Sequence, residues 1–346
     1  MQTKLHDIQK EQNAKFIPFA GYEMPVWYDS IKKEHLAVRE NAGVFDISHM
    51  GIFKLKGETA FELLQYLSCN ELEKAKKNTM VYTMLLNEKG TILDDVMIGS
   101  VTNHQFLLIV NAANKSKIAK WIKKHQKQSA TVEDQNKDHC FLAVQGPKAV
   151  EKLKEILNAP IQKIERFGVG TILVNDHDIT LLRTGYTGEE GFECIVPNGY
   201  AEEFWQKCIE SEITPCGLGA RDTLRIEKGL PLYGQELSES INPLMTRYPW
   251  VVKWDHDYIG KEALLQKKEN PTKKTIGFQL LGRQIPRFNQ AVKQGGVVTS
   301  GTLSPSLNEP IGMAIVDQEL AHSKENIHID IRGNWVEAKQ VNVPFI

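Results

Sequence analysis

Two adjacent carboxylates, Asp94 and Asp95, lie between apolar runs in the segment NEKGTILDDVMIG (residues 87–99). Consecutive side chains of a strand point to opposite faces, so only one of the two carboxylates can face a given cavity. A buried carboxylate is costly unless a cation or a proton compensates it, and functional sites are where this cost is most often tolerated. The pair is therefore a candidate site, and the alternative is one exposed aspartate and one that caps a turn.

A glycine-rich segment, RTGYTGEEGFECIVP (residues 183–197), is the second candidate site. Its closely spaced glycines predict a tight loop whose backbone can approach a ligand. Tyr186 could stack on a flat ring. Glu193, on the strand that leaves the loop, could accept adjacent N–H donors from an amino-pyrimidinone edge such as that of a pterin. A purely structural hairpin loop is the alternative interpretation.

Two arginines, Arg221 and Arg225, lie four residues apart in the segment GLGARDTLRIEKGLPLYGQEL (residues 217–237). On a helix they share one face, and Asp222 can pair with Arg225 at the i+3 position. A face with two guanidinium groups suits a carboxylate or another anion. An exposed, salt-bridged helix face is the alternative.

Composition narrows the class of protein. A chain of 346 residues exceeds the size at which one hydrophobic core stops growing, so we expect more than one folding unit. The net charge of −1 gives no argument for nucleic acid as a partner. No apolar stretch reaches the length of about 20 residues that a membrane helix needs, and the N-terminal residues lack the apolar core of a secretory signal. We therefore expect a cytoplasmic protein.

Metal and disulfide chemistry are not indicated. Five cysteines, an odd number without a C-x-x-C pair, predict reduced and mostly buried thiols. The ten histidines show no metal-ligand spacing, so we predict no metal site. His49 lies in the dense motif FDISHMG, and we interpret it as a structural histidine with satisfied hydrogen bonds rather than as a ligand or base.

The periodicity of apolar residues predicts a mixed α+β protein with largely antiparallel strands. We expect strands at residues 51–57, 80–87, 91–99, 105–111, 141–146, 171–176, 179–188 and 192–197, and helices at residues 30–42, 58–69, 114–125, 147–157, 200–211 and 218–229. From about residue 275 onward, short β segments between turns are typical of a small β-barrel or sandwich. The proline-containing stretch 267–274 is predicted to be a linker.

Several long segments together resemble the aminomethyltransferase, or T-protein, of the glycine cleavage system. They follow the family's order and span nearly the whole chain: PFAGYEMPVWY (18–28), HLAVRENAGVFDISHMG (35–51), YTMLLNEKGTILDDVMIG (82–99), LLIVNAANKSK (107–117), LAVQGPKA (142–149), RTGYTGEEGFE (183–193), GLGARDTLRIEKGLPLYGQEL (217–237), YIGKEAL (258–264) and GGVVTSGTLSPSL (295–307).

The resemblance implies an α+β fold of three domains in a cloverleaf around a central folate cavity, with a ferredoxin-like α+β part and a C-terminal β-barrel. We expect a folate-binding region at residues 1–265 and the barrel domain at residues 275–346. The first region would consist of two interleaved subdomains, roughly 1–50 with 140–265, and 51–139.

The resemblance also implies a reaction. The lipoylated H-protein of the glycine cleavage system is the expected partner and carries the aminomethyl group, and tetrahydrofolate is the co-substrate. The products are 5,10-methylenetetrahydrofolate, ammonia and dihydrolipoyl H-protein. No nucleic acid or membrane partner is expected.

By position, the family's essential aspartate falls on Asp95, which leaves Asp94 a structural role as a hydrogen-bond acceptor or a solvated charge on the other face. Residues that match those of the folate pocket are Tyr82, Asn111, Tyr186, Glu193 and Arg221, with Met50 and Trp250 as weaker matches at its walls. The segment NPLMTRYPWVVKWD (242–255) departs from the family's usual TPLEAGLGWAVK.

Two other functions fit parts of the pattern. A folate-dependent demethylase of the same superfamily would act on a small methylated amine or sulfonium compound and would not need H-protein. A non-enzymatic folate-binding protein that assists iron–sulfur assembly would carry a cysteine-containing KGCYxGQE-like motif. The equivalent segment here, KGLPLYGQE (228–236), has no cysteine, and the acidic pair is intact.

Overall fold

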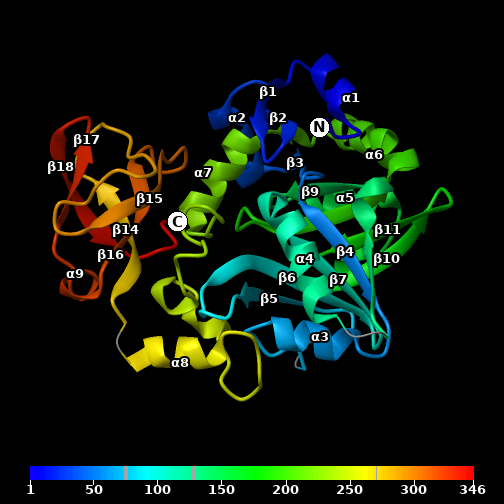
Figure 1. Cartoon of the computed structure of the whole chain (residues 1–346). Coiled ribbons are helices and arrows are strands. Elements are labelled where there is room, and N and C mark those ends of the chain that lie inside the picture. The colour runs from blue at the N-terminus through cyan, green and yellow to red at the C-terminus, as the bar shows by residue number, and fades with distance from the viewer. Residues whose placement is uncertain (74–76, 127–128, 270) are drawn as a thin grey trace. The chain divides into compact units, whose positions relative to one another are not determined.

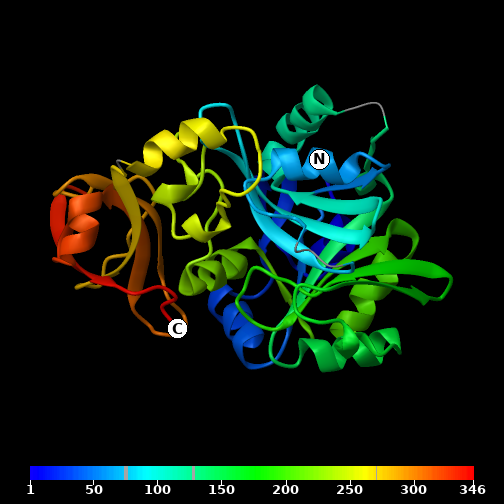
Figure 2. The same cartoon turned by 90° about the horizontal axis from the view of Figure 1, so that it is seen from below.

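The computed structural model describes residues 1–73, 77–126, 129–269 and 271–346. The described chain divides into two compact units that are interleaved in sequence. Unit 1 consists of Met1–Leu64, Leu72–Tyr82 and Val96–Asp222, and unit 2 consists of Gln65–Glu71, Thr83–Asp95 and Thr223–Ile346. Figures 1 and 2 show the elements in two views at right angles.

A six-stranded sheet organises one part of unit 1. Its strands lie in the order β10 (Val169–Val174), β11 (His177–Leu182), β12 (Gly191–Pro197), β9 (His139–Gln145), β3 (Gly43–Asp46) and β13 (Thr214–Cys216). Neighbouring strands are antiparallel, except that β13 runs parallel to β3. Helices α5 (Ala149–Leu157) and α6 (Asn198–Glu210) pack against β9 and β12 (Figure 1). Their apolar faces share a core with the sheet that includes Leu153, Phe192 and Trp205.

A second, five-stranded sheet has the order β5 (Met80–Leu86), β6 (Ile92–Thr102), β7 (Gln105–Val110), β4 (Gly51–Lys56) and β8 (Thr131–Asp134). The pairs β6–β7, β7–β4 and β4–β8 are antiparallel. The hairpin end of β5 and β6, Thr83–Asp95, belongs to unit 2. The helices that follow β4 and β7 are α3 (Ala60–Leu67) and α4 (Lys115–His125).

The remaining elements of unit 1 precede the first sheet in sequence or follow it. They are α1 (His6–Glu11), the antiparallel hairpin β1 (Lys15–Phe19) and β2 (Tyr22–Trp27), α2 (Ile31–Glu40), and the start of α7 (Leu218–Lys228). Ser30 caps the N-terminus of α2, because its hydroxyl accepts the Lys33 amide at 3.3 Å.

The end of the chain, in unit 2, forms a curled antiparallel sheet. Its order is β15 (Gly296–Leu303), β16 (Pro310–Asp317), β14 (Lys273–Leu280), β18 (Asn334–Val341) and β17 (Ile327–Ile331). The two edge strands are linked by a short segment, because Ala291 bridges Val297 of β15 and Val292 bridges Ile329 of β17. This link makes the curled sheet barrel-like and shields its edges. The predicted mixed α+β class and the C-terminal barrel are confirmed.

Several details differ from the sequence prediction. The strand expected at 179–188 ends at Leu182, and α1, β1, β2, β3, β8 and β13 were not expected. The linker expected at 267–274 is shorter, because α8 (Lys261–Glu269) continues to Glu269 and β14 begins at Lys273. A short helix, α9 (Gln318–Ser323), follows β16 and was not expected. The domain boundaries drawn from the resemblance remain predictions. None of the helices in the described ranges is both long and apolar enough to cross a membrane.

Candidate functional site

Three of the predicted site residues come together within unit 1. The Arg221 guanidinium lies over the ring of Tyr186, with 4.5 Å between its carbon and the ring centroid. Glu193 is only 9% exposed. Burial raises the pKa of Glu193 to about 7, although the charge of Arg221 acts in the opposite direction. Within the described part of the chain, no hydrogen bond to the Glu193 carboxylate or from the Arg221 guanidinium is found.

The position of Glu193 follows from its strand. β12 lies between β11 and β9, where Glu193 pairs in register with Leu182 on one side and Ala143 on the other. A residue held by ladders on both sides has little freedom to move toward water, so its carboxylate stays in the protein interior.

The loop that carries Tyr186 is built against the Gln145 side chain. Gln145 donates to the Thr184 carbonyl at 3.1 Å and accepts from the Thr187 hydroxyl at 2.9 Å. A side chain at Gly185 would come within 1.8 Å of the Gln145 oxygen, so this position needs glycine. Arg39 fixes the same loop, because it donates to the Thr187 carbonyl at 2.8 Å.

The position of Arg221 depends on a buried glutamate of α2. Glu34 accepts the amide of Gly217 at 2.9 Å and the amide of Tyr28 at 2.7 Å, so it ties the start of α7 to the end of β2. A Cβ at Gly217 would lie 2.4 Å from the backbone of Val26. Close backbone packing and one carboxylate therefore set where α7, the helix that carries Arg221, begins.

His49 belongs to the same electrostatic neighbourhood. It is 3% exposed and makes an edge-to-face contact with Phe19, with ring centroids 5.4 Å apart. Burial first, and Arg221 second, lower the pKa of His49 to about 3, so the ring is neutral. Its Nδ1 is buried without a partner among the described residues. The expectation of a fully satisfied histidine was therefore wrong, because its surroundings leave one ring nitrogen unpaired.

The other predicted folate contacts of unit 1 lie on the five-stranded sheet or directly beside the ends of its strands. Met50 and Asn111 flank the paired residues Gly51 and Val110, so they occupy the same end of β4 and β7. Tyr82 is half-buried in β5. Their binding role stays a prediction.

Asp94 and Asp95 alternate on β6 as a strand requires, but their burial was not foreseen. Asp94 is fully buried, and Asp95 is half-buried. An exposed Asp94, whether as part of an ordinary acidic pair or as a solvated charge, is thus excluded. The carboxylate of Asp95 acts on Tyr248 of the same unit, where it adds to the rise in the pKa of Tyr248 that burial causes.

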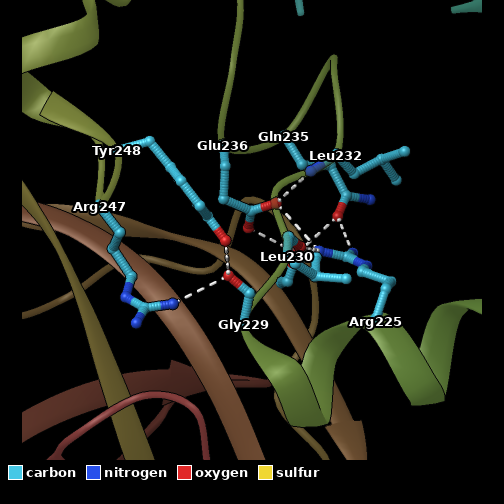
Figure 3. Close-up of polar contacts among 9 residues, drawn as sticks. Arg225, Gly229, Leu230, Leu232, Gln235, Glu236, Arg247 and Tyr248 are labelled. Carbon is cyan, nitrogen blue, oxygen red and sulfur yellow. Dashed lines mark hydrogen bonds and ion pairs between the residues drawn. The ribbon is translucent and has the colours of Figure 1, made fainter. Parts of the chain in front are cut away.

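Two candidate residues of unit 2 differ in their surroundings. Trp250 lies in a short 3₁₀ helix and is 53% exposed. Arg225 is 1% exposed and binds Glu236 at 3.0 Å and Gln235 at 2.8 Å (Figure 3). The prediction that Arg225 shares an anion-binding face with Arg221 was therefore wrong, because its guanidinium is already engaged inside the fold.

Sequence reasoning missed the residues that hold the site. Gln145, Arg39 and Glu34 each connect segments distant in sequence, and no local spacing marks them. The sequence pointed to Gln145 only indirectly. The closely spaced glycines of the 183–191 loop indicate that its backbone packs closely on another group, but they do not say which group. None of the described residues forms a group of three or more side chains suited to hold a metal ion.

Comparison with known proteins covers the whole chain. Residues 5–256 match the GCVT N-terminal domain, and residues 273–346 match the glycine cleavage T-protein C-terminal barrel domain. An aminomethyltransferase of Thermoanaerobacter pseudethanolicus is 42% identical over 99% of this chain and 97% of its own length. One from Chloroherpeton thalassium is 40% identical over 99% of this chain and 98% of its own length.

A solved structure agrees with the sequence comparisons. The glycine cleavage system aminomethyltransferase T from Bartonella henselae superposes with a TM-score of 0.93 at 30% identity, covering 100% of this chain and 98% of that one. The fold and these similarities thus define an enzyme of the aminomethyltransferase type. The chain belongs to the glycine cleavage T-protein family.

Proposed function

We propose that this chain is the folate-dependent aminomethyltransferase of glycine cleavage. It takes the aminomethyl group from the lipoyl arm of H-protein and transfers its carbon to tetrahydrofolate. The products are 5,10-methylenetetrahydrofolate, ammonia and dihydrolipoyl H-protein. The full-length similarity to proteins of that name supports the reaction.

The observation that carries the folate part of the proposal is the unused bonding capacity of Glu193 and Arg221. Glu193 is buried and Arg221 is partly buried, and neither side chain has a hydrogen-bond partner in the described chain. Leaving such groups unpaired is costly, so a ligand that bonds them gains affinity. A pterin offers adjacent N–H donors that fit a carboxylate. We assign the pterin edge to Glu193, and other folate contacts to Arg221 and Tyr186.

The remaining binding roles follow by position in the family. Tyr82, Asn111, Met50 and Trp250 are proposed as further folate contacts. Tetrahydrofolate acts as a co-substrate that leaves with the one-carbon unit.

Asp95 is proposed as the catalytic residue. Positive charge develops on the transferred methylene group as ammonia departs. A fixed carboxylate stabilises this charge without reorganising water. Asp95 also orients the attacking nitrogen and accepts or relays its proton. The half-burial of Asp95 suits this role, because the carboxylate must reach a ligand. Asp94 is fully buried, so we assign it a structural role.

The test is a substrate comparison with purified protein. Aminomethylated H-protein and tetrahydrofolate should yield methylenetetrahydrofolate and ammonia in equal amounts. A small methylated amine or sulfonium compound offered as the donor should yield no product above background. Turnover of the small donor instead of H-protein would assign the chain to the demethylases. Folate binding without any turnover would favour the non-enzymatic alternative.

A further inference from the structure

The segment Gly229–Tyr248, called here the 229–248 loop, is closed at its base by one shared acceptor. The carbonyl of Gly229 accepts a hydrogen bond from Arg247 Nη1 at 2.9 Å and another from the Tyr248 hydroxyl at 3.2 Å (Figure 3). Gly229 follows α7 with a φ of +64°, the left-handed conformation that ends many helices. The two ends of the loop are thus joined directly.

The interior of the loop is fixed by a buried ion pair. Glu236 accepts from Arg225 at 3.0 Å and from the Leu232 amide at 3.0 Å, and Arg225 also reaches Gln235 (Figure 3). Glu236 further accepts from the Ser300 hydroxyl of β15 at 2.6 Å. A buried network whose members are satisfied in this way is rigid.

This rigid loop contacts the strand that carries Asp95. The Ile92 amide, at the first residue of β6, donates to the Ile241 carbonyl at 2.9 Å. The Ile92 carbonyl accepts from the Tyr233 hydroxyl at 3.4 Å. Both backbone polar groups of Ile92 are therefore engaged by the loop, three residues before Asp95.

The same loop is fastened to the C-terminal tail. Arg247 Nη2 donates to the Val343 carbonyl, and the Phe345 amide donates to the Glu227 carbonyl of α7 at 2.8 Å. A side chain on Gly229 would lie 1.9 Å from the Val343 side chain, so the tail packs closely on the end of α7. A guanidinium presents several donors in a fixed fork, so Arg247 holds the two carbonyls from two separate nitrogens, whereas a lysine would have to reach both from its single ammonium nitrogen.

We propose that Arg247 is a positioning residue for Asp95. By joining the base of the 229–248 loop to the C-terminal tail, it holds the loop against Ile92 and so fixes the start of the Asp95 strand. The role in turnover rests on the proposed function, because Asp95 is catalytic only there. Tyr248 lies within electrostatic reach of both groups, since Asp95 adds to the rise in its pKa and Arg247 opposes it.

The experiment compares Arg247→Gln and Arg247→Lys with a control, Arg332→Gln, which removes one exposed arginine from the same unit. Amide hydrogen exchange is measured for peptides that begin several residues before Ile92 and span it, and for peptides from β16, and kcat and KM for tetrahydrofolate are measured in parallel. The exchange data do not depend on catalysis. If the wild-type protein fails to turn over, the proposed function fails while the positioning claim is still tested.

Arg247→Gln should speed exchange at Ile92 about tenfold or more and leave β16 unchanged. It should lower kcat about tenfold, the scale of a modest loss of alignment, with KM within about twofold. Arg247→Lys should resemble Arg247→Gln, because it keeps the charge but loses the fork. The control should match the wild-type protein.

Three outcomes would overturn the proposal. Arg247→Gln could leave Ile92 exchange and kcat unchanged. Exchange could rise equally in β16, which would reveal general destabilisation. Arg247→Lys could restore both quantities fully, which would assign the effect to charge and not to the two-carbonyl geometry.

Discussion

Glu193 and His49 are buried ionisable groups that share Arg221 as an electrostatic neighbour. In both cases burial is the largest cause of the shift, and it favours the neutral form. Arg221 favours the anion of Glu193 and disfavours the cation of His49. This region of unit 1 therefore contains one cation, one carboxyl group that titrates near neutrality and one neutral imidazole. Because the pKa of Glu193 is raised and that of His49 is lowered, the two groups make stability depend on pH in opposite directions.

The first effect belongs to Glu193. Its pKa is about 7 in the folded protein against an ordinary value of 4.5, so the folded state holds an extra proton between these values. The stability present at pH 4.5 is therefore lost as the pH rises through 7, by about 3 kcal/mol. Glu193→Gln removes this loss. Relative to the wild-type protein, the ligand-free variant should gain about 3 kcal/mol in urea denaturation between pH 4.5 and pH 8.

The exposed Glu165 supplies a matched control. Glu165→Gln should keep the same offset from the wild-type protein at both pH values, within about 0.5 kcal/mol. A constant offset for Glu193→Gln as well would contradict the raised pKa of Glu193.

The second effect belongs to His49 and has the opposite sign. Its pKa is about 3 when folded against 6.5 ordinarily, so the unfolded chain binds the extra proton between these values. Stability present above pH 6.5 is lost as the pH falls, by about 2 kcal/mol at pH 5. His49→Gln should abolish that part of the loss, so its disadvantage in urea denaturation should shrink between pH 7 and pH 5. Exposed His322→Gln should show no such change, and an equal change in both variants would refute the assignment to His49.

At the residue scale, the sequence predicted which residue types would matter but not their burial. Strand alternation correctly separates Asp94 from Asp95, but periodicity cannot say that Asp94 lies on a fully covered face. The unpaired nitrogen of His49 likewise depends on neighbours that come from distant segments. Burial depends on tertiary packing. A local pattern tells which face of a strand a side chain is on, but not whether that face is covered.

Helix α7 links local prediction to tertiary structure at the element scale. Its bounds agree with apolar spacing, and its second arginine suggested a local partner at Asp222. The structure shows Glu236 as a partner that spacing does not predict, because the chain turns back after Gly229 and brings a residue eleven positions downstream against Arg225. Where the chain reverses direction, it forms contacts that the spacing of residues on a helix cannot predict.

The buried pair gives a prediction for this element. Glu236→Ala leaves the Arg225 guanidinium buried without its carboxylate, a change that costs about 3–5 kcal/mol. Urea denaturation should report this loss. Exposed Glu325→Ala in the same unit should change stability by less than about 0.5 kcal/mol. A loss below about 1 kcal/mol for Glu236→Ala would mean that the pair does not hold the 229–248 loop.

The barrel marks a second limit of sequence reading at this scale. Short β segments between turns predict a small barrel or sandwich from about residue 275 onward, and the structure has a curled five-stranded sheet there. The bridges that Ala291 and Val292 make to the two edge strands are single residue pairs from a loop, so they have no periodicity to detect. The end of the predicted linker was missed because Lys273 and Lys274 are polar at the start of a strand.

At the scale of the whole molecule, family similarity covers both units, and we expect the folded chain to bind folate. A ligand that binds the folded state and not the unfolded state stabilises the folded state. At a concentration one hundred times the Kd, tetrahydrofolate should add about 2.7 kcal/mol to the free energy of unfolding. Denaturation with increasing tetrahydrofolate measures this directly. p-Aminobenzoylglutamate, which lacks the pterin ring, should add much less, because it offers Glu193 no pterin edge. Equal stabilisation by the two compounds would contradict the role given to Glu193.

The most direct test of the central claim is Asp95→Asn, measured for tetrahydrofolate binding and for turnover with aminomethylated H-protein in the same preparation. Asparagine keeps the size of the side chain and removes its negative charge. Folate binding should remain measurable, and turnover should fall about a hundredfold or more, the scale of one lost electrostatic stabiliser. Turnover close to that of the wild-type protein would contradict the assignment of Asp95 as the catalytic carboxylate.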